Sequence, residues 1–369
     1  MRITCSRDLL LENLQSVLKT VSTKSTMPVL SGIRVEVKGD GKIELASTDM
    51  ELSLRLTIEA VTDGEGALVV PGRLITDVVR SLPAGDVSIE MDEKEQVAAI
   101  QCGTASFRLN CLPAADFPRL PVMPEDGSFE INSEPLISTI NTVARAASRD
   151  ETRPVLTGIL VKFSKDKLKM VATDSYRLSV RETAAESSLK DKKEVIIPRA
   201  SLEELARICT QSGAEKISIG IMDGQAIFTA AGTILTSRLI EGQFPNYQQL
   251  LPDEFKHEIN MDKEELMEAV GRISLMAQKN APLRMKFASG ELTISAQTPQ
   301  VGEARETMPV AFQGEEVEIG FNPEFLREGI DSVAAKQVAL RIISPLRPGL
   351  IKGEGDDFLY LIMPVRLTG

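Results

Sequence analysis

A segment that begins Pro-Val-Leu occurs twice in this chain and constrains its fold more than any other feature. Residues 28–54 read PVLSGIRVEVKGDGKIELASTDMELSL, and residues 154–180 read PVLTGILVKFSKDKLKMVATDSYRLSV. Residues 282–298, PLRMKFASGELTISAQT, repeat the pattern in a diverged form. The period, 126 residues between Pro28 and Pro154, is too long for a solenoid repeat and fits a repeated domain. The chain of 369 residues is therefore predicted to contain three similar units.

Each unit is predicted to contain two amphipathic helices and about seven or eight strands. In the first unit, Leu10, Leu14, Val17, Leu18 and Val21 recur at helical spacing, which predicts a helix over 7–21. Alternating apolar residues over 51–60 predict a strand with one buried face. The other helices are expected at 72–82, 134–149, 200–210, 262–278 and from 323 onward, and the last strand at 358–367. Helices on one face of antiparallel sheets make an α+β fold.

Composition narrows the class of protein. Hydrophobic residues make up 43% and charged residues 26%, as in soluble globular proteins. The charged N-terminus lacks the apolar run of a signal peptide, so we expect a cytoplasmic protein. The formal net charge of −11 argues against a protein that grips nucleic acid by bulk attraction.

No catalytic or metal-binding motif is apparent. The four cysteines, Cys5, Cys102, Cys111 and Cys209, show no Cys-x-x-Cys spacing, and the single histidine, His257, has no cysteine near it. We therefore expect reduced, packed thiols, no metal site and no cofactor. Glycine-rich phosphate-binding motifs are absent from the sequence,.

Carboxylates offer one alternative, an enzyme. Asp49 and Glu51 have the spacing of residues on one side of a strand, where they would pair for metal or acid–base chemistry. Asp174, the counterpart of Asp49, has no second carboxylate before Glu182. A capped turn beside an exposed rim is the favoured interpretation.

Basic residues recur at helical spacing. Arg73 and Arg80 are seven residues apart, as are Arg272 and Lys279, and Arg145 and Arg149 are four apart; each pair is expected to share a helical face. They form either an ordinary solvated face or a positive surface shared by several helices. With no tryptophan and 4% aromatic residues, stacking on single strands is not expected. Sequence-independent contact with duplex phosphates fits better.

Five segments closely resemble the bacterial sliding clamp family, the β subunit of the replicative DNA polymerase. They are LPAADFP at 112–118, MVATDSYRL at 170–178, VIIPR at 195–199, FPNY at 244–247 and LIMPVRL at 361–367. The resemblance covers the whole chain. It implies a head-to-tail homodimer in which three clamp domains per chain (1–122, 123–252 and 253–369) form a ring around duplex DNA. The residues implied to face DNA are Lys24, Arg73, Arg80, Arg149 and Arg199.

The family also binds short peptides, which carry a glutamine and hydrophobic anchors, in a pocket between the second and third domains. The implied partners are the polymerase catalytic subunit, the clamp loader and other replication and repair proteins. Carried over by motif, the pocket residues are Arg153, Leu156, Thr173, Ser175, Tyr176, Arg177, Leu178, Pro245, Leu250, Asn322, Phe325, Leu346, Leu361, Met363, Pro364 and Arg366. Ser175, Tyr176 and Gln249 stand where some relatives have glycine, histidine and arginine, which bears on peptide preference.

At the junction between protomers, the resemblance implies that an edge strand of domain one meets domain three of the other copy. The residues implied on the two sides are Phe107, Arg108 and Leu109, and Leu275, Glu303 and Glu306. Arginine facing glutamate mainly fixes orientation, although Arg305 lies among these glutamates.

Three hypotheses follow. The first is a non-enzymatic clamp that encircles DNA and confers processivity. The second is a carboxylate-dependent enzyme on a triplicated scaffold, using Asp49, Glu51 or Asp174. The third is a protein-binding scaffold that does not bind DNA.

Overall fold

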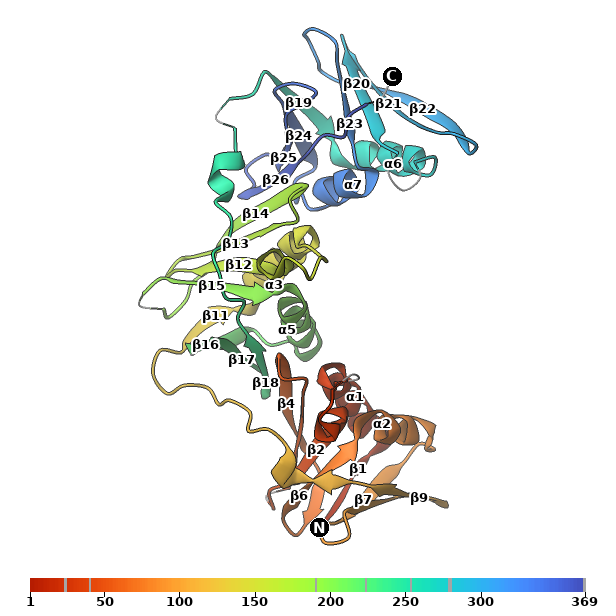
Figure 1. Ribbon diagram of the computed structural model, residues 1–369, viewed down its shortest axis with the longest axis vertical. Coiled ribbons are helices and arrows are strands. Elements are labelled where there is room, and N and C mark those ends of the chain that lie inside the picture. The colour runs from red at the N-terminus through yellow and green to blue at the C-terminus, as the bar shows by residue number, and fades with distance from the viewer. Residues whose placement is uncertain are drawn as a thin grey trace. The chain divides into compact units, whose positions relative to one another are not determined.

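The computed structural model describes residues 1–22, 25–39, 41–189, 191–222, 224–252, 254–277 and 281–367. The chain divides into two compact units (Figure 1). Unit 1 comprises Met1–Ser133 and Glu204–Leu239, and unit 2 comprises Glu134–Glu203 and Ile240–Gly369.

Unit 1 is built from two sheets with two helices beside them. A nine-stranded sheet has the order β10-β6-β2-β3-β4-β18-β17-β16-β11, and a five-stranded sheet has the order β5-β1-β7-β8-β9. Helices α1 (Arg7–Val17) and α2 (Gly72–Ser81) lie side by side against strands of the larger sheet (Figure 1). The strands are β1 (Arg2–Ser6), β2 (Gly32–Val37), β3 (Lys42–Thr48), β4 (Leu52–Glu59), β5 (Val61–Asp63), β6 (Gly66–Pro71), β7 (Asp86–Asp92), β8 (Val97–Cys102), β9 (Ala105–Asn110), β10 (Leu112–Pro113), β11 (Phe129–Asn132), β16 (Lys216–Met222), β17 (Gln225–Ala230) and β18 (Thr233–Arg238).

Unit 2 follows the same plan. An eight-stranded sheet has the order β15-β12-β13-β14-β26-β25-β24-β19, and a four-stranded sheet has the order β22-β21-β20-β23. Its helices are α4 (Pro154–Thr157), α6 (Lys263–Ser274) and α7 (Pro323–Asp331), while α3 (Ser133–Val143) and α5 (Arg199–Ser212) have residues in both units. The strands are β12 (Gly158–Phe163), β13 (Lys167–Thr173), β14 (Arg177–Ala184), β15 (Lys193–Pro198), β19 (His257–Asp262), β20 (Leu283–Ala288), β21 (Glu291–Thr298), β22 (Gly302–Pro309), β23 (Val317–Phe321), β24 (Gln337–Ile342), β25 (Gly349–Gly353) and β26 (Phe358–Ile362).

The repeated segments fold into the same three-stranded antiparallel meander three times. The meanders are β2-β3-β4, β12-β13-β14 and β20-β21-β22. Gly32 and Gly158 open the first two, and both lie close to a neighbouring strand. A Cβ atom would come within 2.2 Å of Val69 at Gly32 and within 2.5 Å of Ile196 at Gly158. The glycine of the repeated motif is thus needed for close approach of two strands.

The helices cover their sheets with the apolar stripes that the sequence predicts. Leu10, Leu14 and Val17 of α1 are at most 1% exposed, and burial of each such side chain contributes about 1.5–3 kcal/mol. The hydroxyl of Ser6 caps the first turn of α1 by accepting a hydrogen bond from the Leu9 amide,.

Helix ends differ from the prediction. The helix expected over 134–149 ends at Val143 and is followed by a 3-10 turn, η4 (Ala144–Ala146). The Ser148 amide then bonds to the Leu156 carbonyl, which takes the chain out of the helix. Arg149 is exposed beyond this turn, so the expectation that Arg145 and Arg149 share a helical face is wrong. Helices α1 and α6 likewise end early, at Val17 and Ser274, and η1 (Leu18–Thr20) follows α1.

The last strand is also shorter than predicted. Strand β26 ends at Ile362, because Pro364 has no amide to continue the ladder,. The Met363 amide bonds instead to the Tyr176 carbonyl, and the Val365 amide bonds to the Gly320 carbonyl. The short strands β5 and β10 were not predicted.

All four cysteines are free and buried. Burial raises the pKa of the Cys5, Cys111 and Cys209 thiols to about 11. Within the described part of the chain, no helix has the length and apolar character needed to span a membrane.

Candidate functional site

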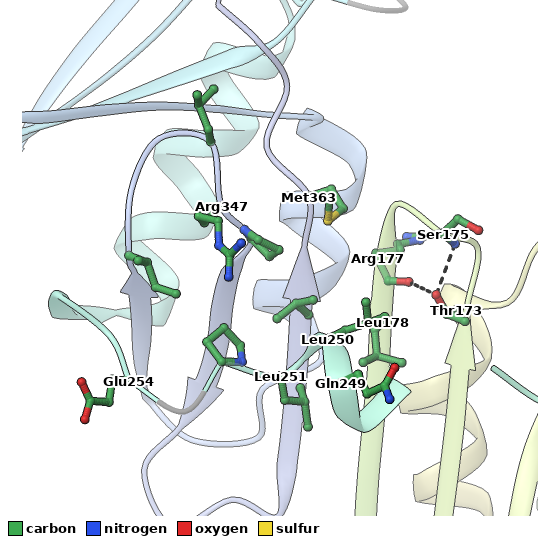
Figure 2. Close-up of a pocket in the computed structure, with 15 residues that line it drawn as sticks. Thr173, Ser175, Arg177, Leu178, Gln249, Leu250, Leu251, Glu254, Arg347 and Met363 are labelled. Atoms are coloured by element: carbon green, nitrogen blue, oxygen red, sulfur yellow. Dashed lines mark hydrogen bonds between the residues drawn. The ribbon is translucent and has the colours of Figure 1, made fainter. Parts of the chain in front are cut away.

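A cavity with a volume of about 850 Å³ lies in unit 2, where the second and third repeats share a sheet (Figure 2). Four parts of the chain contribute to it: the β13–β14 turn with the start of β14, residues 249–252 with Glu254, the β24–β25 loop, and the end of β26. The lining residues are Thr173, Ser175, Arg177, Leu178, Gln249, Leu250, Leu251, Pro252, Glu254, Ile343, Leu346, Arg347, Pro348, Leu361 and Met363.

A tightly bonded turn forms one wall of this cavity. The Thr173 hydroxyl donates to the Arg177 carbonyl at 2.6 Å and accepts from the Ser175 amide at 3.2 Å, as Figure 2 shows. The Asp174 carboxylate accepts from the amides of Tyr176 and Arg177. Ser175 has a positive φ of 81°, a conformation that is uncommon for a residue with a Cβ atom. This network fixes the turn at the cavity mouth.

The cavity has a buried apolar floor and an exposed apolar rim. Leu178 of β14 and Leu361 of β26 are paired in register, and both belong to a core cluster with Phe244 and Tyr247. On the rim, Leu250, Leu346 and Met363 are 52%, 71% and 41% exposed. Exposed apolar side chains around a concave surface are typical of a site for a partner's apolar anchors.

Arg177 holds the turn to the surrounding elements. Its side chain is only 8% exposed and pairs with Asp174 at 3.0 Å and with Glu328 of α7. It also donates to the Arg145 carbonyl at 2.5 Å and contacts the Tyr360 hydroxyl at 3.4 Å. Burial opposes the charge of Arg177, but these partners outweigh it and raise its pKa. Burial raises the pKa of Tyr360, although the positive charge of Arg177 acts in the opposite direction.

The structure brings half of the predicted pocket residues to the cavity. These are Thr173, Ser175, Arg177, Leu178, Leu250, Leu346, Leu361 and Met363. The other eight, Arg153, Leu156, Tyr176, Pro245, Asn322, Phe325, Pro364 and Arg366, do not line it.

Several of these eight residues have structural roles beside the cavity. Leu156 is 8% exposed and buried. Asn322 caps α7 through its side-chain oxygen, and Phe325 lies under the Arg177 guanidinium. Arg153 donates to Ser175 Oγ at 3.0 Å, so it supports the rim.

Sequence reasoning did not select the β24–β25 loop beyond Leu346. Ile343, Arg347 and Pro348 reach the cavity from this loop, which carries no periodic pattern. Leu251 and Pro252 also line the cavity, and the sequence did not predict them.

The residues predicted to face DNA lie on or near helices. Arg73 and Arg80 are exposed on α2, and Arg199 is the first residue of α5. Within the described residues, Arg73 makes no ion pair, whereas Arg80 pairs with Asp77 and Arg199 with Glu203. Lys24 and Lys279 lie outside the described residues.

Five of the six residues predicted at the protomer junction lie on strands that are sheet edges among the described residues, and the sixth, Leu275, follows helix α6. Strand β9, with Phe107 and Arg108, is the last strand of the five-stranded sheet, and β22, with Glu303 and Glu306, is the last strand of the four-stranded sheet. Leu275 is 79% exposed and Phe107 is 37% exposed. Leu109 is only 5% exposed, so its side chain faces the core of its own unit.

Comparison with known proteins places the whole chain in one family. Residues 1–121, 130–246 and 248–366 match the N-terminal, central and C-terminal domains of the DNA polymerase III beta subunit. The beta sliding clamp of Streptomyces coelicolor is 33% identical over 380 residues, covering 100% of both chains. The chain belongs to the DNA polymerase III beta subunit family.

Solved structures of this beta subunit family agree. The DNA polymerase sliding clamp of Bacillus subtilis superposes with a TM-score of 0.93 at 30% identity, over 100% of both chains. A sliding clamp of Pseudomonas aeruginosa, solved with griselimycin bound, has a TM-score of 0.91 at 30% identity, again over 100% of both chains. The resemblance and the three-domain α+β clamp fold predicted from the sequence are confirmed. The domain boundaries at 122/123 and 252/253 stay predictions.

Within this family fold, the carboxylates of the enzyme hypothesis are turn caps. Asp49 and Glu51 lie in the β3–β4 turn, where Asp49 accepts hydrogen bonds from the Glu51 and Leu52 amides. The favoured interpretation, a capped turn, is therefore confirmed. Glu51 pairs with Arg238 and Asp174 with Arg177. Among the described residues, no three His, Cys, Asp or Glu side chains are grouped to hold a metal ion.

Proposed function

We propose that this protein is a DNA polymerase processivity factor that forms a homodimeric ring around duplex DNA. The ring slides along the duplex and tethers the polymerase through the cavity of unit 2. The observation that carries this proposal is a strand pairing that occurs twice within the chain. In both cases the third meander strand of one repeat pairs with the last strand of the next repeat. For the third repeat, the same pairing needs the first repeat of a second copy.

This strand pairing lies in the two sheets that join successive repeats. The third meander strand of the first repeat, β4, pairs with the last strand of the second repeat, β18. In the same way, β14 pairs with β26. The registers are equivalent: Leu54 lies opposite Leu235 at the first seam, and its counterpart Ser179 lies opposite Tyr360 at the second.

Among the described residues of its own chain, the third repeat has no such partner. Its third meander strand, β22, and the last strand of the first repeat, β9, are both edge strands. Unprotected edges invite pairing with another chain. Pairing β22 of each copy with β9 of the other satisfies all four edges, and a head-to-tail contact that closes gives a ring.

The same register predicts which residues meet at this junction. The strand pairings within each repeat show which positions are equivalent in the three repeats. Glu303 occupies the position of Ser53 and Leu178, and Arg108 occupies the position of Thr236 and Leu361. Arg108 is therefore expected directly opposite Glu303 of the other copy, with Phe107 opposite Ala304. Opposite charges on facing residues stabilise a cross-strand pair.

Phe107 gives independent support for the junction. Its counterparts Leu235 and Tyr360 are each 1% exposed, whereas Phe107 is 37% exposed. Leu275, which is also exposed, follows α6 in the third repeat, and the third repeat of the other copy is the one that would cover Phe107. Burial of these two apolar side chains would favour the dimer.

Enclosure explains how an acidic protein stays on DNA. A chain with a net charge of −11 gains little from bulk attraction, and a ring needs none. The helices that carry Arg73, Arg80 and Arg199 are proposed to line the hole, with Arg149 near them. Weak phosphate contacts of this kind carry no sequence information and permit sliding.

The cavity is proposed to receive short linear motifs of the polymerase catalytic subunit, the clamp loader and other replication and repair proteins. Its leucine floor would hold a peptide's apolar anchors, and Met363 suits a surface that serves different peptides. The protein is proposed to work in the cytoplasm, without catalysis and without a cofactor.

Retention on DNA tests the proposal. The clamp is loaded onto nicked circular DNA with a clamp loader, and bound protein is measured after gel filtration before and after linearisation. Retention on the circle and rapid loss from the linear form are expected. Equal retention on both forms would indicate adhesion, and failure of the chain to dimerise would exclude the ring.

A further inference from the structure

A second, smaller cavity occupies the corresponding place at the seam between the first and second repeats. Its volume is about 100 Å³, against about 850 Å³ for the larger one. It lies within unit 1, at the β3–β4 turn, the end of β18 and residues 118–121.

The β3–β4 turn at the smaller cavity has the same hydrogen bonds as the β13–β14 turn at the larger one. The Thr48 hydroxyl donates to the Leu52 carbonyl and accepts from the Met50 amide, as Thr173 does with Arg177 and Ser175. Met50 has a φ of 78° and Ser175 a φ of 81°. The scaffold of the cavity is therefore repeated, and only the lining side chains change.

The change in lining replaces apolar groups by polar ones. The strand registers place Ser53 where the larger cavity has Leu178, and Thr236 where it has Leu361. Both are 6% exposed. Within the described residues, neither hydroxyl has a hydrogen-bond partner in the protein, so both are available to a ligand.

Two arginines line the same cavity as these hydroxyls. Arg238 and Arg119 line the cavity with a single carboxylate, Glu51. Arg119 is exposed and makes no ion pair in the described part of the chain. Arg238 pairs with Glu51 at 3.2 Å, but these side chains are 59% and 69% exposed, and such a pair is weak enough to exchange.

We propose that this cavity is a second recognition site, which takes the carboxylate of an aspartate or glutamate side chain from a partner protein. The volume admits one small side chain and excludes a leucine or phenylalanine together with its neighbours. Arginines bind carboxylates with charge-assisted hydrogen bonds, and the two hydroxyls add donors. Met50, 51% exposed on the rim, offers apolar contact to the adjoining residue, which favours a protein segment over a free acid.

Disulfide capture at the cavity mouth tests the site directly. In a Met50→Cys variant, the new thiol is exposed, whereas the four native thiols are buried. The probes are the capped dipeptides Cys-Glu and Cys-Gln, equilibrated in glutathione buffer and read by mass spectrometry. Capture of the glutamate dipeptide is expected to exceed that of the glutamine dipeptide by about threefold to tenfold, as weak surface ion pairs allow.

Matched variants assign the preference to the arginines. In the Met50→Cys variant, Arg119→Gln together with Arg238→Gln should abolish the preference for the glutamate dipeptide. Arg119→Lys together with Arg238→Lys should retain part of this preference. A cysteine substituted for Val61, which is 76% exposed on β5 and outside the cavity, should show no preference.

Three results would overturn the proposal. The first is equal capture of both dipeptides by the Met50→Cys variant, and the second is a preference for the glutamate dipeptide that survives the glutamine substitutions. The third is equal capture of the dipeptides together with preferential capture of 3-mercaptopropionate over its amide, which would assign the cavity to free acids and not to a protein segment. None of these results bears on retention of the ring on DNA.

Discussion

The guanidinium carbon of Arg177 lies 4.1 Å from the centroid of the Phe325 ring. The same guanidinium pairs with Asp174 and Glu328, so one buried cation holds the turn at the cavity mouth against helix α7. Cation–π contact and two carboxylates together compensate the loss of water around the charge.

Removing this cation should destabilise the protein strongly. Arg177→Ala leaves two largely buried carboxylates without their partner, and a loss of about 3 kcal/mol in unfolding free energy is expected. The measurement is the urea midpoint followed by circular dichroism. Lys256→Ala, which breaks the exposed pair with Glu315, is the control and should leave the urea midpoint nearly unchanged. Comparable losses in both variants would contradict the role given to Arg177.

Much of this fold follows from patterns in the sequence. The alternation over 51–60 predicts β4, because alternation of apolar residues is a local property of the sequence. The residue at which a helix ends depends on contacts outside the helix. Helix α3 stops at Val143 because the Ser148 amide bonds to Leu156, a contact that no pattern in 134–149 encodes.

The candidate site shows the same division. Thr173 and Leu178 belong to a contiguous motif and were predicted to line the cavity. Glu328, 151 residues from Arg177, meets it only through tertiary packing. Arg347 likewise depends on the pairing of β24, β25 and β26, which sequence periodicity does not specify.

The rim of the larger cavity should carry peptide affinity. Leu250→Ala with Met363→Ala removes two exposed side chains without opening the core. Affinity for a fluorescent peptide with a glutamine and two hydrophobic anchors should fall about thirtyfold, at roughly 1 kcal/mol for each of the two anchor contacts. Fluorescence anisotropy measures it. Leu74→Ala, which truncates a leucine 49% exposed on α2, is the control and should bind normally; an unchanged affinity in the double variant would move the site elsewhere.

Leu156 separates packing from binding. Because its side chain is only 8% exposed and does not line the cavity, Leu156→Ala should lower the unfolding free energy by about 2–5 kcal/mol. Peptide affinity per folded molecule should stay the same. Thermal unfolding and anisotropy on one preparation test both, and a stable variant with weakened binding would contradict this placement.

Buried thiols should make stability fall at alkaline pH. Burial raises the pKa of Cys5, Cys111 and Cys209 from 9.0 to about 11. Between these values the unfolded chain binds fewer protons than the folded one, so stability is full below pH 9 and declines as pH rises toward 11. The melting temperature from pH 8 to 11 measures the effect. A variant with alanine at all three positions should show a flatter profile; an identical profile would assign the decline to other groups.

Charge reversal tests the register proposed for the protomer junction. Arg108→Glu and Glu303→Arg should each weaken the homodimer by about tenfold or more, because like charges then face each other across paired strands. The two changes together in one chain should restore most of the affinity, since each junction again joins opposite charges. Sedimentation equilibrium measures the dimer. Arg305→Glu, on the same strand but expected opposite the uncharged Ser106, is the matched control and should leave the dimer unchanged. If Arg305→Glu instead strengthens the dimer, Arg305 faces Arg108 and the register is shifted by two residues.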